Sequence, residues 1–377
     1  MTSVEHLQKL RLRAVALAES LPAPAQTMSH HADLSPLLWH VGHMLYIEQH
    51  WLLERVGGLS LPAEQGYLFR ADGMPRRLRS RFVPPLDVLK GAIASWSADM
   101  PSLLAQHAAH ALLQDGYLVH FLVQHHSQHI EIMQQILLAY AVQHAAPYHP
   151  ETALTPRPVA TVGISRPTGF ATMGADLPRA YDNERPAHQI SLSAFRIGLQ
   201  PVCNAAYLTF ILDGGYQNRR WWTSESWQWQ RNLGVTAPLG WRQDPDGHWY
   251  AVGPGGPHDL QGEAAVQGVS AYEAAAFARY AGWRLPTEQE WECAAREGQL
   301  EGIGGAWEWC ASTFHPYGGF RAFPYRGYSM PWFDGMHRTL RGHSPYTDPS
   351  LRRPTFRNFY TPEKRHVFAG LRLCIDG

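Results

Sequence analysis

Apolar residues recur with helical spacing through the first 143 residues, where glycine is scarce. The spacing predicts four long helices, at about residues 3–20, 35–55, 86–112 and 116–142. Modest loops join these segments, so we expect a four-helix bundle. Ser35 and Pro36 predict the start of the second helix, because serine can cap free amides and proline fits the first helical position.

The expected fourth helix carries histidines within its apolar stripe. That stripe comprises Leu118, Phe121, Leu122, Ile132, Met133 and Ile136. His125 and His129 fill its missing positions, so both should face the bundle interior, one turn apart and within reach of a single ion. The second helix offers His40 or His43 as a third ligand. A lone buried histidine is usually a core residue, but this combination favours a metal site for zinc, iron or copper.

Beyond residue 143 the amino-acid composition and the pattern of apolar residues change. The stretch from His144 to Ala160 contains four prolines and is expected to be a linker. Residues 161–377 then run in short segments rich in Gly, Pro, Trp and Tyr, which predict a loop-rich α+β domain. Two helices are expected there, around Ser270 to Ala281 and around Thr287 to Ala295.

Composition excludes several classes of function. Hydrophobic residues make up 45% of the chain and charged residues 17%, which is typical of a globular protein. The 32 basic and 32 acidic side chains balance, so no net field attracts nucleic acid or an anionic membrane. The amino terminus shows neither a signal-peptide core nor a membrane span, which predicts a cytoplasmic protein. The four cysteines form no CxxC pair, so we expect reduced, mostly buried thiols.

Two further features are candidate binding residues. Gln128 follows His125 by three positions, so its amide either orients a substrate at the rim of the metal site or bonds to a neighbouring helix. Five arginines lie between the second and third expected helices: Arg70, Arg76, Arg77, Arg79 and Arg81. Their guanidinium groups suit a carboxylate or phosphate on a small donor, although a solvated loop is the more frequent explanation.

Several motifs in order resemble a known family. SPLLWHVGHMLYIEQHWLL and HHSQHIEIM are similar to the DinB-type bundle of the ergothioneine-synthesis sulfoxide synthases. GWRLPTEQEWECAA, AWEWCAS, LRGHSPYTD and FRNFYTPEKRHVFAGLRLC resemble the formylglycine-generating-enzyme-like domain, which has a C-type-lectin-related fold. The resemblance implies that residues 1–143 supply the metal ligands and residues 161–377 the substrate pocket.

The resemblance also implies an activity and a set of site residues. Ferrous iron bound by His43, His125 and His129 would use O2 to join a sulfur or selenium donor to imidazole carbon 2 of hercynine, which is N-trimethylated histidine. Gln128, Asn358 and Phe359 correspond to hercynine-binding residues of the family, and Arg76 and Arg79 are candidates for binding the donor. A tyrosine would deliver a proton; Tyr317 is the candidate, with Tyr325 and Tyr328 as rivals.

One position departs from the thiol-using members of that family. They carry an aspartate after the pocket aromatic, where it holds the amino group of γ-glutamylcysteine, and this chain has Tyr360 there. The substitution favours a donor without an ammonium group, such as the selenosugar of the selenoneine synthase branch. Phe359, Tyr360, Trp307 and Trp309 would suit the trimethylammonium group of hercynine, although the tryptophans are equally typical of a core.

Other interpretations of the sequence stay open. An ordinary ergothioneine sulfoxide synthase would use γ-glutamylcysteine or cysteine as the donor. A DinB-type metal-dependent thiol transferase would need no O2, and a lectin-like binding module would carry structural histidines only. A true formylglycine-generating enzyme is disfavoured, because the segment LRGHSPYTDPSLRRPTFRN lacks the close cysteine pair that such enzymes require, and Cys310 and Cys374 are expected to be core residues.

Overall fold

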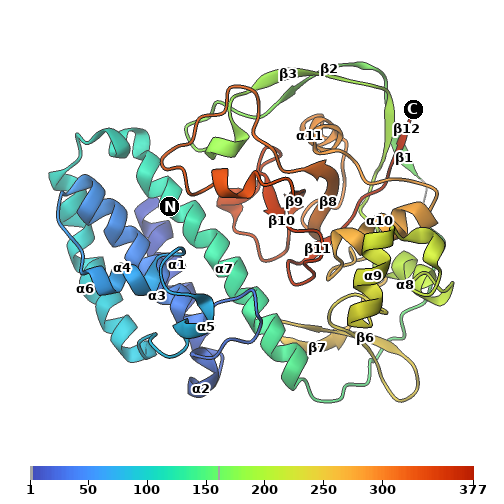
Figure 1. Ribbon diagram of the computed structural model, residues 1–377, viewed down its shortest axis with the longest axis horizontal. Coiled ribbons are helices and arrows are strands. Elements are labelled where there is room, and N and C mark those ends of the chain that lie inside the picture. Colours follow the sequence, from blue (N-terminus) through green and yellow to red (C-terminus); the bar gives the residue numbers. More distant parts are fainter. Residues whose placement is uncertain (1–2, 160–161) are drawn as a thin grey trace. The chain divides into compact units, whose positions relative to one another are not determined.

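The computed structural model describes residues 3–159 and 162–377. Contacts along the backbone divide the chain into two compact units. The first unit comprises Met1–Gln143 together with Tyr346–Leu351, and the second comprises His144–Pro345 together with Arg352–Gly377. Figure 1 shows the helices of the first unit in blue to teal and the mixed second unit in green to red.

Long helices build the first unit: α1 (Ser3–Glu19), α3 (Leu37–Gln49), α6 (Leu86–Gln106) and α7 (Tyr117–His144). Helix α1 packs against α3 and α6, and α3 also packs against α6. Short helices lie between them: α2 (Ala23–Gln26), α4 (Ala63–Phe69) and α5 (Arg76–Arg79). The stripe expected on α7 is mostly buried, with Leu118, Met133 and Ile136 fully enclosed. The expected helical bundle is therefore confirmed.

The ends of two helices differ from the sequence-based prediction. Helix α3 starts after Pro36 without a side-chain cap, because Ser35 Oγ instead accepts a hydrogen bond from Arg79. The prediction that Ser35 caps this helix is wrong. Helix α3 also continues directly into a π-helix at His50–Val56, and α6 stops at Gln106 rather than residue 112.

The segment Tyr346–Leu351 clusters with the helices although it lies far along the sequence. Thr347 Oγ1 donates to Glu131 at 2.7 Å, and Ser350 Oγ lies 3.1 Å from Ser127 Oγ. Both partners are on α7, on either side of His129. The segment therefore contacts the helix that carries two of the expected metal ligands.

The proline-rich stretch after α7 is anchored to the second unit. Asp259 accepts hydrogen bonds from Tyr148 Oη at 2.7 Å and from the backbone amides of Glu151 and Thr152 at 3.2 and 3.0 Å. One carboxylate thus binds three donors of this stretch, which gives it a defined path without regular structure.

The second unit is an α+β fold, with four small sheets among the residues that the structure describes. The largest has the order β10 (Asn358–Tyr360), β9 (Arg338–His343), β8 (Ala306–Thr313) and β11 (Ala369–Gly370). A second has the order β1 (Gly163–Arg166), β4 (Phe195–Gly198) and β12 (Cys374–Asp376). The others pair β2 (Gly169–Met173) with β3 (His188–Leu192), and β5 (Trp241–Gln243) with β6 (Trp249–Gly253) and β7 (Gly256–Asp259).

Longer helices accompany these sheets: α8 (Asn204–Leu212), α9 (Ser224–Leu233), α10 (Ala271–Tyr280) and α11 (Glu288–Arg296). Helices α10 and α11 lie where the sequence predicts helices. Each starts at a capping box, formed by Ser270 with Glu273 and by Thr287 with Glu290. Helix α11 packs against β2, β4, β8 and β9, so it joins three of the sheets.

Apolar residues of the second unit enclose the thiols. One core cluster comprises Leu192, Phe195, Ile197, Cys293, Ala294 and Cys374. Cys310 is also buried, and all four cysteines are free. Burial raises the pKa of Cys293 to about 11 and that of Cys374 to about 12, so these thiols stay protonated and unreactive. Within the described ranges, none of the helices has the length and apolar character needed to cross a bilayer.

Candidate metal centre

Helices α3 and α7 bring three histidines together inside the first unit. One ring nitrogen from each of His43, His125 and His129 lies within 4.8 Å of the others. His43 is 3% exposed and His125 is 9% exposed, so the cluster is shielded from water. The helical stripe placed His125 and His129 on the interior face, and α3 presents His43 to them.

A backbone carbonyl determines which nitrogen of His43 carries a proton. His43 Nδ1 lies 2.6 Å from the carbonyl oxygen of Phe69 at the end of α4, and a carbonyl can only accept. Nδ1 therefore donates, and Nε2 of the neutral ring holds a lone pair. Gly42 makes this approach possible, because a Cβ at that position would lie 2.2 Å from the Phe69 ring.

A chain of hydrogen bonds sets the tautomer of His125 in the same way. Glu48 Oε1 lies 2.8 Å from His126 Nε2, so this nitrogen carries the proton that is donated to the carboxylate. Nδ1 of the neutral His126 ring then accepts from His125 Nδ1 at 3.2 Å. His125 consequently has its proton on Nδ1 and a lone pair on Nε2.

These two lone pairs face one another. His43 Nε2 and His125 Nε2 are 3.3 Å apart, and both belong to rings whose single proton is on the other nitrogen. Two lone pairs at this distance repel unless a cation lies between them. The donor set of neutral imidazoles therefore fits a divalent transition metal, for which imidazole is a suitable ligand.

His129 completes the set with a third orienting partner. Its Nδ1 lies 2.9 Å from Nδ1 of His40, one turn before His43 on α3. When His129 Nδ1 donates to His40, Nε2 of His129 is left as a lone pair. Each of the three rings thus has a neighbour that fixes its orientation: a backbone carbonyl, His126 or His40.

Burial keeps these rings neutral. It lowers the pKa of His43 to about 4 and lowers the pKa values of His40, His125 and His129 well below the ordinary histidine value. The neighbouring rings repel any added proton and lower these pKa values further. Neutral imidazole is the form that binds a metal, so the cluster is ready for metal binding at neutral pH.

Trp39 and Arg79 pack beside the histidines. The Trp39 ring stacks on His43 at 4.6 Å, and the Arg79 guanidinium lies 3.9 Å from the centre of the Trp39 ring. Arg79 is 3% exposed and donates to Ser35 Oγ and to the carbonyls of Ala71 and Met74. Its charge therefore holds the α4–α5 loop in place. Arg76, on the same short helix, is exposed.

Gln128 is half-buried on α7, and its amide nitrogen lies 3.4 Å from the carbonyl of Gln124. This bond lies within one helix. The binding of hercynine by Gln128 stays a prediction.

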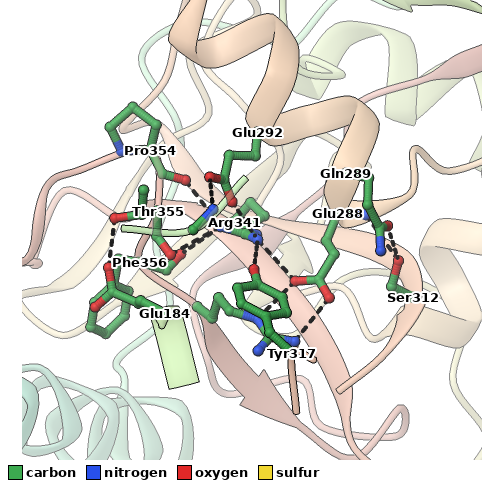
Figure 2. Close-up of polar contacts among 12 residues, drawn as sticks. Glu184, Glu288, Gln289, Glu292, Ser312, Tyr317, Arg341, Pro354, Thr355 and Phe356 are labelled. Atoms are coloured by element: carbon green, nitrogen blue, oxygen red, sulfur yellow. Dashed lines mark hydrogen bonds and ion pairs between the residues drawn. The ribbon is translucent and has the colours of Figure 1, made fainter. Parts of the chain in front are cut away.

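The second unit contains a different polar cluster, centred on Arg341 (Figure 2). Its guanidinium contacts Glu288 and Glu292 at 2.9 Å each and donates to the carbonyls of residues 354–356. Arg357 also pairs with Glu288 at 2.9 Å. Burial alone raises the pKa of Glu288, but the guanidinium groups of Arg357 and Arg341 outweigh it and the net pKa is lowered.

Tyr317 belongs to this charged cluster. Its hydroxyl accepts a hydrogen bond from Arg341 at 3.0 Å, and its ring lies 4.2 Å below the Arg357 guanidinium. Burial raises its pKa well above the usual tyrosine value, so the phenol stays protonated. The ring also borders a cavity of about 300 Å³ that Glu288, Gln289 and Ser312 line. Its role as proton donor stays a prediction.

The other expected pocket residues follow one another on β10 and are half-buried. Asn358 Oδ1 accepts from the Phe359 backbone amide at 3.0 Å. The Phe359 ring stacks on Phe314 at 4.2 Å, and the Tyr360 ring lies 6.3 Å from His366. Trp307 and Trp309 are 1% and 0% exposed, so they are core residues and do not line a pocket.

Sequence reasoning leaves several supporting residues unassigned. Glu48 has no motif of its own, and the sequence marks His126 only as a neighbour of the expected ligand. The signal that could have pointed to Glu48 is its place on α3, five residues after His43 and inside the apolar pattern. The Phe69 carbonyl leaves no mark in the sequence.

Comparisons with known proteins extend over both units. Residues 150–302 and 300–377 match the family described as sulfatase-modifying factor enzyme 1-like domain. The whole chain is 33% identical to the hercynine oxygenase of Mycobacterium tuberculosis, with 100% of both chains covered. It is 35% identical to the hercynine oxygenase of Mycolicibacterium thermoresistibile over 91% of this chain and 88% of that one. The hercynine oxygenase of Mycolicibacterium smegmatis is 30% identical, with 100% and 99% covered.

Proposed function

Because this chain belongs to the hercynine oxygenase family, we propose that it is a non-haem iron enzyme that uses O2 to join a sulfur or selenium donor to imidazole carbon 2 of hercynine. The observation that carries the proposal is the pair of facing lone pairs on His43 and His125, with His129 beside them. When bound there, ferrous iron would supply the redox and Lewis-acid chemistry through which O2 accepts electrons from the two substrates.

The electron balance is consistent with O2 as the oxidant. Joining a thiol to carbon 2 breaks one S–H and one C–H bond and removes two electrons. Oxygenating the sulfur to a sulfoxide removes two more. One O2 accepts these four electrons, with one oxygen atom going to sulfur and the other to water.

Residues of the chain bind and orient the reactants. Gln128, about one turn after His125 and directly before His129 on α7, positions the hercynine carboxylate or imidazole. Asn358 and Phe359 also bind hercynine, since a trimethylammonium group cannot donate a hydrogen bond and favours an aromatic face. Arg76 is exposed and binds the donor. Arg79 is also a sequence-based candidate for binding the donor, but it is buried and its guanidinium donates to the chain itself, so we assign it to supporting the loop that carries Arg76. Tyr317 delivers a proton from its protonated phenol.

The donor separates two versions of this function. The three relatives are named for hercynine oxygenation, which supports the sulfur reaction of ergothioneine synthesis. Tyr360 supports the second version, in which a selenosugar is the donor, because a phenol cannot neutralise the ammonium group of γ-glutamylcysteine. The common step is bond formation between the chalcogen and imidazole carbon 2.

Products identify the reaction directly. Ferrous enzyme prepared without oxygen is given hercynine, O2 and, in separate reactions, γ-glutamylcysteine, cysteine, a thiosugar or a selenosugar, and the products are read by mass spectrometry. An adduct of hercynine that requires both iron and O2 supports the proposal. Thiol transfer without O2 consumption would establish a DinB-type transferase instead. A protein that binds no iron would exclude the proposed metal site.

A further inference from the structure

A buried carboxylate lies behind the candidate metal site, two hydrogen bonds away from it. Glu48 is 0% exposed, and its two oxygens serve different partners. Oε2 accepts from Arg11 at 3.0 Å and from Trp96 at 2.8 Å. Oε1 accepts from His126, which is also fully buried. Arg11 is the ion-pair partner of the carboxylate, and His126 contributes one N–H to the other oxygen.

We propose that Glu48 and His126 form a tautomer relay that keeps the metal-binding nitrogen of His125 free of its proton. The direction of each step follows from the donor and acceptor atoms of a neutral His126 ring. The carboxylate can only accept, so His126 Nε2 donates; Nδ1 of the neutral ring then accepts, so His125 Nδ1 donates. The remaining nitrogen, His125 Nε2, faces His43 as a lone pair. Glu48 and His126 are positioning residues, since neither faces the metal site directly.

Glu48→Gln would reverse this relay although it changes the shape of the side chain very little. The amide has one accepting oxygen, and this oxygen should face the two donors, Arg11 and Trp96. Its NH2 group then faces His126 Nε2, which must accept. The His126 proton moves to Nδ1 and donates to His125 Nδ1, so the proton of His125 moves to Nε2. The metal-binding atom is then blocked.

His126→Phe interrupts the relay without reversing it. Glu48 keeps Arg11 and Trp96, while His125 loses the acceptor for its Nδ1 proton and adopts both tautomers. Loss of such an orienting partner typically weakens metal binding by roughly 10- to 100-fold. When Glu48→Gln is combined with His126→Phe, the introduced amide has no histidine ring to hydrogen-bond. The substitution at Glu48 should then cause no further loss of Fe(II) affinity. This non-additivity separates a relay from two independent packing defects.

The test measures iron binding and tautomers without turnover. Fe(II) affinity of the apo-protein is determined without oxygen against a competing chelator, and 15N NMR of histidine-labelled apo-protein reports which ring nitrogens are protonated. We expect Glu48→Gln to bind Fe(II) roughly 100-fold more weakly or worse, with His125 protonated at Nε2. His126→Phe and the double variant should be equal to each other and weaker than the wild type. Trp96→Phe, which leaves Oε1 and Arg11 in place, should bind Fe(II) nearly as the wild type does.

The proposal rests on the metal site within the proposed function and not on hercynine chemistry. Wild-type Fe(II) binding tests the site, and the variants test the relay, so the two can fail separately. The relay would be overturned if His126→Phe bound Fe(II) as tightly as the wild type. It would also be overturned if the double variant lost Fe(II) affinity by the product of the factors lost in the two single variants. Thermal unfolding would show whether Glu48→Gln folds. If it does not, His126→Phe still tests the relay through its Fe(II) affinity and through the presence of both His125 tautomers.

Discussion

The two units each bury a polar cluster, and the clusters differ in charge. In the first unit, imidazole rings with lowered pKa values surround His125 Nε2, which faces another lone pair. In the second unit, Arg341 and Arg357 form ion pairs with Glu288 and Glu292, so each charge has a counter-charge. Burial of polar groups is common to both. Of these two clusters, only the first has lone pairs that face one another without a positive charge between them, and a cation would bind there.

Desolvation produces these opposite results because the neighbours differ. Burial disfavours the charged form of any group, so the histidines lose their protons and become ligands. Glu288 is equally buried, but two guanidinium groups restore its charge and tie up its oxygens. A buried titratable group is therefore a candidate ligand only when its neighbours leave its lone pair unused.

The largest effect should come from removing one of the three imidazoles. His43→Ala, His125→Ala and His129→Ala should fold, yet lose bound iron and all hercynine turnover, because two imidazoles hold the ion too weakly. Iron content by mass spectrometry and circular dichroism check both parts. His120→Ala, elsewhere on α7, is the matched control and should keep its iron. Iron content like that of the wild type in any of the three variants would exclude the site.

Breaking the charged cluster should destabilise the fold without affecting iron. Arg341→Met leaves Glu288 and Glu292 buried without this partner, which typically costs about 3–5 kcal/mol of unfolding free energy. Arg157→Met removes an exposed pair with Glu263 and should cost less than about 1 kcal/mol. Urea unfolding measures both. Equal losses in the two variants would show that the buried cluster has no special role.

Donor choice should respond to the residue after Phe359. Tyr360→Asp should improve use of γ-glutamylcysteine relative to a selenosugar or thiosugar, since a restored charge-assisted contact is worth roughly 1.5–3 kcal/mol. Competition assays give the ratio of specificity constants. In the wild type we expect the sugar donor to be preferred. A higher specificity constant for γ-glutamylcysteine would leave the sulfur reaction as the function, with Arg76 as the group that binds the donor carboxylate.

The smallest effect should come from Gln128, which we expect to bind hercynine rather than iron. Gln128→Ala should retain its iron and bind hercynine about 2- to 10-fold more weakly, the loss of roughly one hydrogen bond of 0.5–1.5 kcal/mol. Calorimetry on the anaerobic ferrous protein gives both quantities. Loss of iron with unchanged hercynine affinity would assign Gln128 to the metal site instead.

The sequence by itself determined which elements form and which faces they bury. The α7 stripe predicted that His125 points inward, and Ser270 and Thr287 predicted the starts of α10 and α11. These inferences succeed because helical period and capping are local and depend on residues within a few positions of each other. The motif order likewise pointed to the family, which the comparisons show.

Tertiary structure decided which partners those side chains meet. Glu48 reaches His126 across 78 positions of sequence, and the Phe69 carbonyl selects the tautomer of His43 from a separate short helix. Ser35 has the sequence context of a helix cap, but its hydroxyl instead accepts a hydrogen bond from Arg79, 44 positions away. A hydrogen bond depends on the distance and direction between two atoms, and for residues this far apart only the folded chain sets both.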